Sequence, residues 1–275
     1  MTNIQLILIS AIQGITEFLP VSSSGHLALF SYFTSFPDQG LALDVAVHVG
    51  SILAVIIYFS PTIYNIIKSL FKTKFIPTFQ ENDAKTFWLL VIGTIPVVIV
   101  GLVLHKLGLE ELRNPRLIGW TISGYGILLY IADKYSITIR SIKHLNALDA
   151  FLIGFAQCFS LIPGTSRSGI TITMGRFLGM ERREAAKFSM LLSIPAIIGA
   201  GSLVAYELYQ TQNLQAILYS FDAVAYSFVA SIIAIYIVMW WLKKSTFFPF
   251  VIYRICLGTF LLLDSYGYLN KWLDL

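Results

Sequence analysis

The sequence predicts an all-α polytopic membrane protein, with six transmembrane helices and two re-entrant helical hairpins arranged as an inverted-topology repeat. Hydrophobic residues make up 56% of the chain and charged residues only 12%, about half the charged share of a soluble domain. This composition predicts the lipid bilayer as a partner, and it excludes a soluble enzyme and a nucleic-acid-binding protein. Cys158 and Cys256 lie in apolar runs and are expected to be small buried thiols.

Six unbroken apolar stretches approach the roughly 20 residues that a helix needs to span the hydrocarbon core. They are residues 41–59, 86–104, 117–132, 188–206, 223–242 and 247–263. Two further stretches are broken: residues 4–19 run into Pro20 and a group of serines before resuming at 27–33, and residues 151–162 run into Pro163 before resuming at Ile170. Broken backbone at membrane depth must be covered by protein or by a water-filled cavity, so we expect both to be re-entrant hairpins.

Lysine and arginine indicate the orientation, because they gather in cytoplasmic loops. Most of the 19 basic residues lie within 60–85, 133–146 and 176–187 or at the pair Lys243 and Lys244. If both hairpins return to the side on which they began, all these segments share one side of the membrane. We therefore predict that both termini lie outside. The basic residues of segment 105–116 are the exception to this pattern.

We expect a single membrane domain over residues 1–275, with a first repeat at 1–132 and a second, inverted repeat at 147–275. Each repeat has one hairpin and three spans, and the odd number of spans inverts the second repeat. An offset of 144 residues pairs Gln13 with Gln157, Ser22 with Ser166, Ser24 with Ser168 and Gly25 with Gly169. Inverted repeats with broken helices place a binding site where the two breaks meet.

The breaks carry three of the few ionisable residues inside apolar segments, and such residues are functional candidates. Glu17 and His26 belong to the first break and Arg167 to the second. A Ser/Gly-rich loop that opens a helix binds anions through backbone N–H groups, and a guanidinium fits phosphate oxygens. We therefore expect Arg167 to bind phosphate, together with Gly164, Thr165, Ser166, Ser168, Thr171 and Arg254.

The first break also supplies candidate metal ligands and catalytic groups. Gln13 and Glu17 lie four residues apart, on one face of a helix. A carboxylate with an amide oxygen suits Mg²⁺ or Ca²⁺ when phosphate and water complete the coordination. Ser23 and His26 offer a nucleophile and a base or second nucleophile.

Structural roles stay open beside these functional ones. Glu17 and Arg167 could form a buried ion pair that joins the hairpins, and the serines could simply cap helices. Asp44 and His48, four residues apart on the next span, could support the hairpin. Arg254 could bridge backbone carbonyls instead of contacting phosphate.

These motifs resemble the undecaprenyl-pyrophosphate phosphatase family, the bacterial lipid phosphatases associated with bacitracin resistance. Residues 13–26 match the family pattern of Glu or Gln, three residues and Glu, continuing into Phe-Leu-Pro-x-Ser-Ser-x-Gly-His. Residues 163–171 match Pro-Gly-x-Ser-Arg-Ser-x-x-Thr, and residues 248–254 are also similar to the family. The resemblance implies an enzyme of the bacterial cytoplasmic (inner) membrane that uses Mg²⁺ or Ca²⁺. Its substrate would be the prenyl diphosphate lipid undecaprenyl diphosphate, and its product undecaprenyl phosphate, the carrier for cell-wall precursors.

The resemblance also implies roles for individual residues. Glu17 would bind metal or orient water, and Arg167 would hold the diphosphate. Ser23 and His26 would share the nucleophile and proton-transfer roles, in an order that the sequence leaves open.

Gln13 is the uncharged variant at its position in the family pattern. Asp44 is the candidate for the missing carboxylate. A homo-oligomer is neither required nor excluded by the sequence.

Two other functions share features with this sequence. Acid-phosphatase-like membrane phosphatases share a Ser-Gly-His element, but they need a histidine where this chain has Thr173. An anionic-lipid transporter or flippase would use the same midplane site, since inverted repeats are common in transporters.

Overall fold

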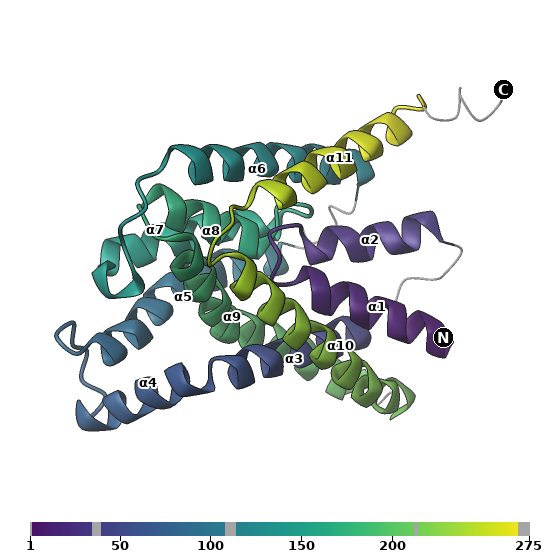
Figure 1. The fold of residues 1–275 in the computed structure, drawn as a ribbon. Helices are drawn as coiled ribbons and strands as arrows, with labels where there is room; N and C mark the ends of the chain where they lie inside the picture. Colours follow the sequence, from purple (N-terminus) through teal and green to yellow (C-terminus); the bar gives the residue numbers. More distant parts are fainter. Residues whose placement is uncertain (1, 35–39, 108–113, 212–213, 269–275) are drawn as a thin grey trace.

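The computed structural model describes residues 2–34, 40–107, 114–211 and 214–268, which fold into a bundle of helices (Figure 1). Within these ranges there is no strand, and one isolated bridge joins Arg140 to Met180. The helices are α1 (Asn3–Thr16), α2 (Ser23–Phe33), α3 (Leu41–Tyr58), α4 (Ser60–Lys72), α5 (Asn82–Lys106), α6 (Pro115–Tyr135), η1 (Ile142–His144), α7 (Ala147–Gln157), η2 (Cys158–Leu161), α8 (Arg167–Phe177), α9 (Arg182–Thr211), α10 (Leu214–Trp241) and α11 (Phe248–Ser265).

Helices occupy all six stretches that were predicted to span the bilayer. α5, the Phe221–Trp241 part of α10, and α11 are each long and apolar enough to cross a membrane. α3 qualifies only together with α4, and these two helices are bent by 76° relative to each other. α6 and α9 cover the remaining two stretches with 21 and 30 residues. The chain is therefore a multi-pass α-helical membrane protein, as predicted, with a bend after Tyr58 that was not predicted.

The two predicted breaks have the same local structure. Ser22 precedes α2 with a φ of 77°, and Ser166 precedes α8 with a φ of 73°. Each serine caps its helix, because its Oγ accepts a hydrogen bond from a backbone N–H three residues later: Gly25 over 3.3 Å and Gly169 over 3.0 Å. Positions that match at the offset of 144 residues thus form matching turns.

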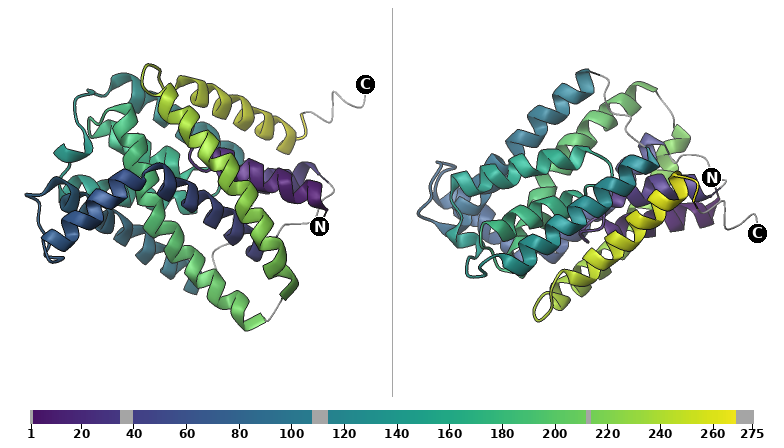
Figure 2. Two further views of the ribbon diagram at one scale, coloured as in Figure 1. Left: turned by 60° about the horizontal axis from the view of Figure 1, so that its bottom comes forward. Right: turned by 90° about the horizontal axis from the view of Figure 1, so that it is seen from above.

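Small residues let helices from the two halves of the chain approach closely. α1 packs against α10, and α7 packs against α5, while α11 lies beside α6 (Figure 2). A Cβ added to Gly14 would stand 2.7 Å from the backbone oxygen of Ser227, and one added to Gly154 would stand 2.8 Å from the Cα of Gly93. Close approach at small residues is how membrane helices gain packing energy.

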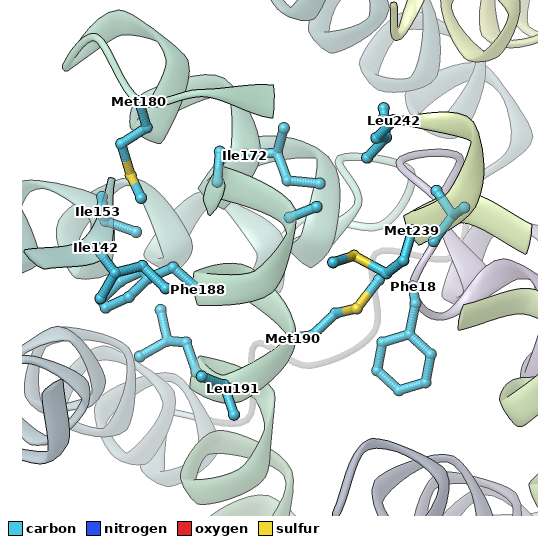
Figure 3. Packing of buried hydrophobic residues seen from close by; sticks show 14 of the residues in the cluster. Phe18, Ile142, Ile153, Ile172, Met180, Phe188, Met190, Leu191, Met239 and Leu242 are labelled. Carbon is cyan, nitrogen blue, oxygen red and sulfur yellow. The ribbon is translucent and has the colours of Figure 1, made fainter. Parts of the chain in front are cut away.

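An apolar layer fixes the chain directly beside the first break. Phe18 is 1% exposed and lies close to Met190 of α9 and Met239 of α10 (Figure 3). All three side chains belong to the largest cluster of buried hydrophobic residues. Because Phe18 follows Glu17 in the chain, this packing fixes where the Glu17 carboxylate stands.

Asp133 joins several helices at the end of the bundle that carries the basic segments. Asp133 Oδ1 accepts hydrogen bonds from Arg176 Nε over 3.1 Å and from Arg182 Nε over 2.7 Å. Its Oδ2 accepts from the backbone N–H of Phe247 over 3.1 Å. The sequence predicts Arg176 and Arg182 only as signals of orientation, but they also join α8 and α9 to Asp133 of α6, which in turn holds the start of α11.

The prediction of buried thiols is wrong for Cys256, which is exposed on α11, while Cys158 is half-buried. Both sides of a membrane helix are apolar, so an apolar run does not distinguish a lipid-facing cysteine from a core cysteine.

Gly154→Ala should destabilise the protein. Its new Cβ would overlap the backbone of Gly93, and overpacking of this kind costs about 1–3 kcal/mol. Gly101→Ala, on α5 with open space around it, is the matched control. We expect G154A to lower the Tm in detergent while G101A leaves it unchanged or raised; equal Tm values for the two variants would contradict the packing.

Candidate active site

The two breaks meet, and direct hydrogen bonds join them. Ser168 Oγ at the second break donates to Leu19 O at the first break over 2.8 Å. Arg254 of α11 bonds to both breaks: its Nη1 donates to Pro20 O over 3.0 Å and its Nη2 to Gly164 O over 3.2 Å. Pro20 O and Gly164 O lie beyond the ends of the preceding helices, so they have no helical N–H partner. These hydrogen-bonding groups of the two loops are therefore satisfied inside the protein, by each other and by Arg254.

Arg254 is fully buried, and its guanidinium donors are used for this bridging. Its Nη2 also donates to Thr165 O over 3.0 Å, and its Nε donates to Ile122 O of α6 over 2.9 Å. Arg254 could either contact phosphate or bridge backbone carbonyls, and these contacts are those of a carbonyl bridge. Contact between Arg254 and phosphate stays a prediction that these bonds do not support, because the same donors are already taken.

Glu17 and Arg167 form a buried ion pair across the two breaks. Glu17 Oε1 accepts from Arg167 Nη2 over 2.9 Å, and the two side chains are 5% and 14% exposed. Arg167 Nη1 donates to Ser189 O of α9 over 3.1 Å. The buried Nε of Arg167 has no hydrogen-bond partner among the described residues. An unpaired buried donor is unfavourable, so this N–H is suited to an anionic ligand.

The second carboxylate oxygen of Glu17 organises the first break. Glu17 Oε2 accepts from Ser23 Oγ over 2.6 Å and from Gln13 Nε2 over 2.9 Å. Ser23 is half-buried, in the first turn of α2. A serine hydroxyl that donates to a carboxylate has a base at hand to take its proton. This arrangement is that of an activated nucleophile.

The ring of His26 is held at both nitrogens. Its Nδ1 lies 2.6 Å from Ser22 O, and because a carbonyl only accepts, Nδ1 carries the proton. Its Nε2 lies 2.5 Å from the hydroxyl of Tyr253, whose ring stacks on the imidazole at a centroid distance of 5.6 Å. In the neutral ring Nε2 therefore accepts from Tyr253.

The side chain of His48, on α3, reaches Glu17. His48 Nε2 lies 3.7 Å from Glu17 Oε2, and His48 Nδ1 donates to the backbone oxygen of Asp44 over 2.6 Å. The carboxylate of Asp44 as a metal ligand stays a prediction.

Three small polar side chains of the second break, those of Ser166, Ser168 and Thr171, bond to the protein itself, whereas the buried Oγ1 of Thr165 has no hydrogen-bond partner among the described residues. Ser166 Oγ caps α8 and lies 3.2 Å from Ser168 Oγ. Thr171 Oγ1 donates to Arg167 O over 2.9 Å and lies 2.7 Å from Ser189 Oγ. The structure brings these residues together, but the Ser166, Ser168 and Thr171 side chains bond to protein. The groups left for an anion are the Thr165 hydroxyl and the backbone N–H groups at the start of α8.

Comparison with known proteins identifies the family of this chain. The model of the bacitracin resistance protein BacA family matches residues 6–260. The chain belongs to this family. The undecaprenyl-diphosphatase of Roseobacter denitrificans is 46% identical over 97% of this chain and 100% of its own length. The undecaprenyl-diphosphatase of Alteromonas mediterranea is 43% identical over 95% and 98% of the two chains. Undecaprenyl-diphosphatase 1 of Rhodospirillum rubrum is 41% identical over 97% and 96%. The family suggested by the motifs is confirmed.

The oxygens at the first break fit a hard divalent cation. Gln13 is fully buried, and its Oε1 has no partner in the described part of the chain. Together with the Glu17 carboxylate, it offers two of the oxygen ligands that Mg²⁺ or Ca²⁺ prefers. The described residues contain no group of three His, Cys, Asp or Glu side chains that could hold a metal. A cation at this BacA-family site would therefore depend on phosphate and water for its remaining ligands.

Sequence reasoning left two contributors to the site unassigned: Ser189, whose backbone oxygen accepts from Arg167, and Tyr253, which holds His26. His48, a candidate for support of the hairpin, faces Glu17 with its ring. All three stand on helices other than the two breaks. Of the two unassigned residues, Tyr253 carried a signal, since it lies in the third stretch that is similar to the family.

Proposed function

We propose that this member of the BacA family hydrolyses undecaprenyl diphosphate to undecaprenyl phosphate and phosphate, and so recycles the carrier lipid for peptidoglycan synthesis. The undecaprenyl-diphosphatases named above align with nearly the whole chain. One observation carries the proposal: Arg167 and Ser23 converge on the Glu17 carboxylate, at 2.9 Å and 2.6 Å. A phosphate-binding group, a hydroxyl and a base thus stand within reach of one substrate group.

The charge of the diphosphate must be neutralised before a nucleophile can approach it. Arg167 supplies a guanidinium whose Nε–H has no protein partner in the described residues. The backbone N–H groups at the starts of α2 and α8 add further donors. Together they would hold the terminal phosphate near Ser23.

Ser23 Oγ then attacks the terminal phosphorus while its proton moves to Glu17 Oε2. The bond from that phosphorus to the bridging oxygen breaks, and Glu17 passes the proton to the departing undecaprenyl phosphate. Water next attacks the phosphoserine, gives a proton to Glu17, and releases phosphate as Glu17 returns that proton to Ser23 Oγ. Splitting the reaction into two displacements is the usual benefit of covalent catalysis.

His26 is the other candidate nucleophile. Its Nε2 is held by Tyr253 and its Nδ1 by Ser22 O. No carboxylate bonds to its ring in these contacts, whereas Ser23 bonds to one. We therefore assign attack to Ser23 and assign His26 with Tyr253 to positioning the head group.

A divalent cation is the proposed cofactor, held by Glu17 and Gln13 Oε1, with Asp44 as a further candidate ligand. When bound, Mg²⁺ or Ca²⁺ would neutralise phosphate charge and favour departure of the leaving group.

We propose that the architecture comprises six spans and two re-entrant hairpins in two inverted repeats, 1–132 and 147–275. Two observations support it: the matching serine-capped turns, and the reciprocal packing of α1 on α10 and of α7 on α5. The proposed location is the cytoplasmic membrane, with both termini and the site toward the outer face. A lateral opening would let the prenyl chain stay in lipid while the diphosphate enters the site.

Arg167→Lys should lower phosphate release from undecaprenyl diphosphate with Mg²⁺ by at least about a hundredfold, as removal of a transition-state donor does. Lysine keeps the positive charge beside Glu17 but loses the planar guanidinium, which can donate two parallel hydrogen bonds to phosphate. Arg116→Lys is the matched control, since Arg116 is exposed and bonds to Ser265 O. Purified R116K should keep the wild-type rate. Full activity in R167K would refute the site, and saturable lipid binding without release by the wild type would favour an anionic-lipid transporter.

Ser23 should be the phosphorylated residue. Acid quenching of wild-type turnover followed by peptide mass spectrometry should find phosphoserine at residue 23, and Ser23→Ala should lose both the phosphopeptide and the activity. Ser24→Ala, at the exposed neighbouring serine, should retain both. In a parallel base-quenched sample, a phosphopeptide that survives base but not acid, and persists in S23A, would instead indicate His26.

A further inference from the structure

A cavity away from the proposed catalytic residues lies at the bend between α3 and α4. It has a volume of about 420 Å³ and is lined by Tyr58, Phe59, Pro61, Thr62, Arg183, Glu184, Lys187, Tyr236 and Met239. These residues come from the end of α3, the start of α4, the first two turns of α9 and the second half of α10. None of them takes part in the proposed hydrolysis.

The cavity carries two cations that the protein leaves unpaired. Arg183 and Lys187 make no ion pair or hydrogen bond with any residue that the structure describes. Arg182, beside them in the chain, is by contrast neutralised by Asp133 over 2.7 Å. The carboxylate in the wall, Glu184, accepts from the backbone N–H of Ile142 over 3.1 Å. The cavity therefore has an excess of positive charge and of unused donors.

Aromatic and hydroxyl groups complete the wall. The rings of Tyr58 and Tyr236 meet edge to face at 4.7 Å, and Thr62 stands on the first turn of α4. Arginine, lysine and hydroxyl donors around an aromatic wall form a site for phosphate oxygens.

The position of α4 indicates that the ligand is a lipid. α4 leaves α3 at 76° and exposes the large apolar side chains of Tyr64, Ile67 and Phe71, which are 65%, 47% and 68% exposed. Lys68 is exposed on the same helix. A helix with exposed apolar and basic side chains is typical of one that lies in the plane of the membrane interface. The cavity at its first turn would then open at the level of the lipid head groups.

We propose that this cavity binds the phosphate head group of an anionic phospholipid through Arg183 and Lys187. The acyl chains would lie along α3 and α10, beside the exposed ring of Tyr236. The bound lipid would hold the bend between α3 and α4 at the membrane surface.

Native mass spectrometry of the purified full-length protein tests the proposal, with phosphatidylglycerol as the probe and phosphatidylcholine as the zwitterionic comparison. We expect wild type to prefer phosphatidylglycerol. In R183Q/K187Q its affinity should fall about thirty-fold, as two basic residues at an anionic membrane surface contribute. K243Q/K244Q removes the same charge from an exposed pair outside the cavity and should bind like wild type.

R183K/K187R keeps both charges and should retain binding, which separates charge from a folding defect. Equal phosphatidylglycerol affinity in R183Q/K187Q and K243Q/K244Q would overturn the site. Loss of binding in R183K/K187R as well would also overturn it. Inorganic phosphate that competes as strongly as phosphatidylglycerol would overturn the assignment to a lipid.

Discussion

The Glu17–Arg167 ion pair is the interaction on which the arrangement of the two broken helices depends. Each charge sits at the end of a helix whose surroundings are apolar, and each would be strongly destabilising if left alone there. Their 2.9 Å contact joins the two breaks. It also places a guanidinium, a carboxylate and the Ser23 hydroxyl in one small volume. The pair therefore neutralises two charges inside the bundle and forms the centre of the proposed phosphate site.

Contacts near the ion pair and farther from it keep the two breaks in place. Arg254 and Ser168 bond the loop backbones to each other, so the charged side chains do not have to hold the loops alone. Phe18 anchors the first break in the apolar layer with Met190 and Met239. Farther away, close contacts at small residues lock α1 and α7 against helices of the opposite half. A buried charge pair is tolerated when its neighbours satisfy the remaining donors and acceptors.

Much of the site followed from the sequence because its signals are local. Breaks at Pro20 and Pro163, and serines at matched positions, predicted two turns that the structure contains. Contacts between distant helices were harder to predict: His48, Tyr253 and Ser189 reach the site only through tertiary packing. An apolar run also does not show which side of its helix faces the protein core, and for this reason Cys256 was wrongly predicted to be buried. The bend after Tyr58 was missed because residues 60–85 were predicted only as a basic segment on one side of the membrane, and the direction of a helix does not appear in composition.

Thermal unfolding of the E17Q, R167Q and E17Q/R167Q variants in detergent tests the central claim most directly. Removing one member of a buried pair leaves an uncompensated charge and costs about 3–5 kcal/mol, whereas removing both is far less unfavourable. We predict that the double variant unfolds at a higher temperature than R167Q alone, although it carries one more substitution. Additive losses, with the double variant less stable than either single variant, would contradict the claim that this pair holds the two breaks together.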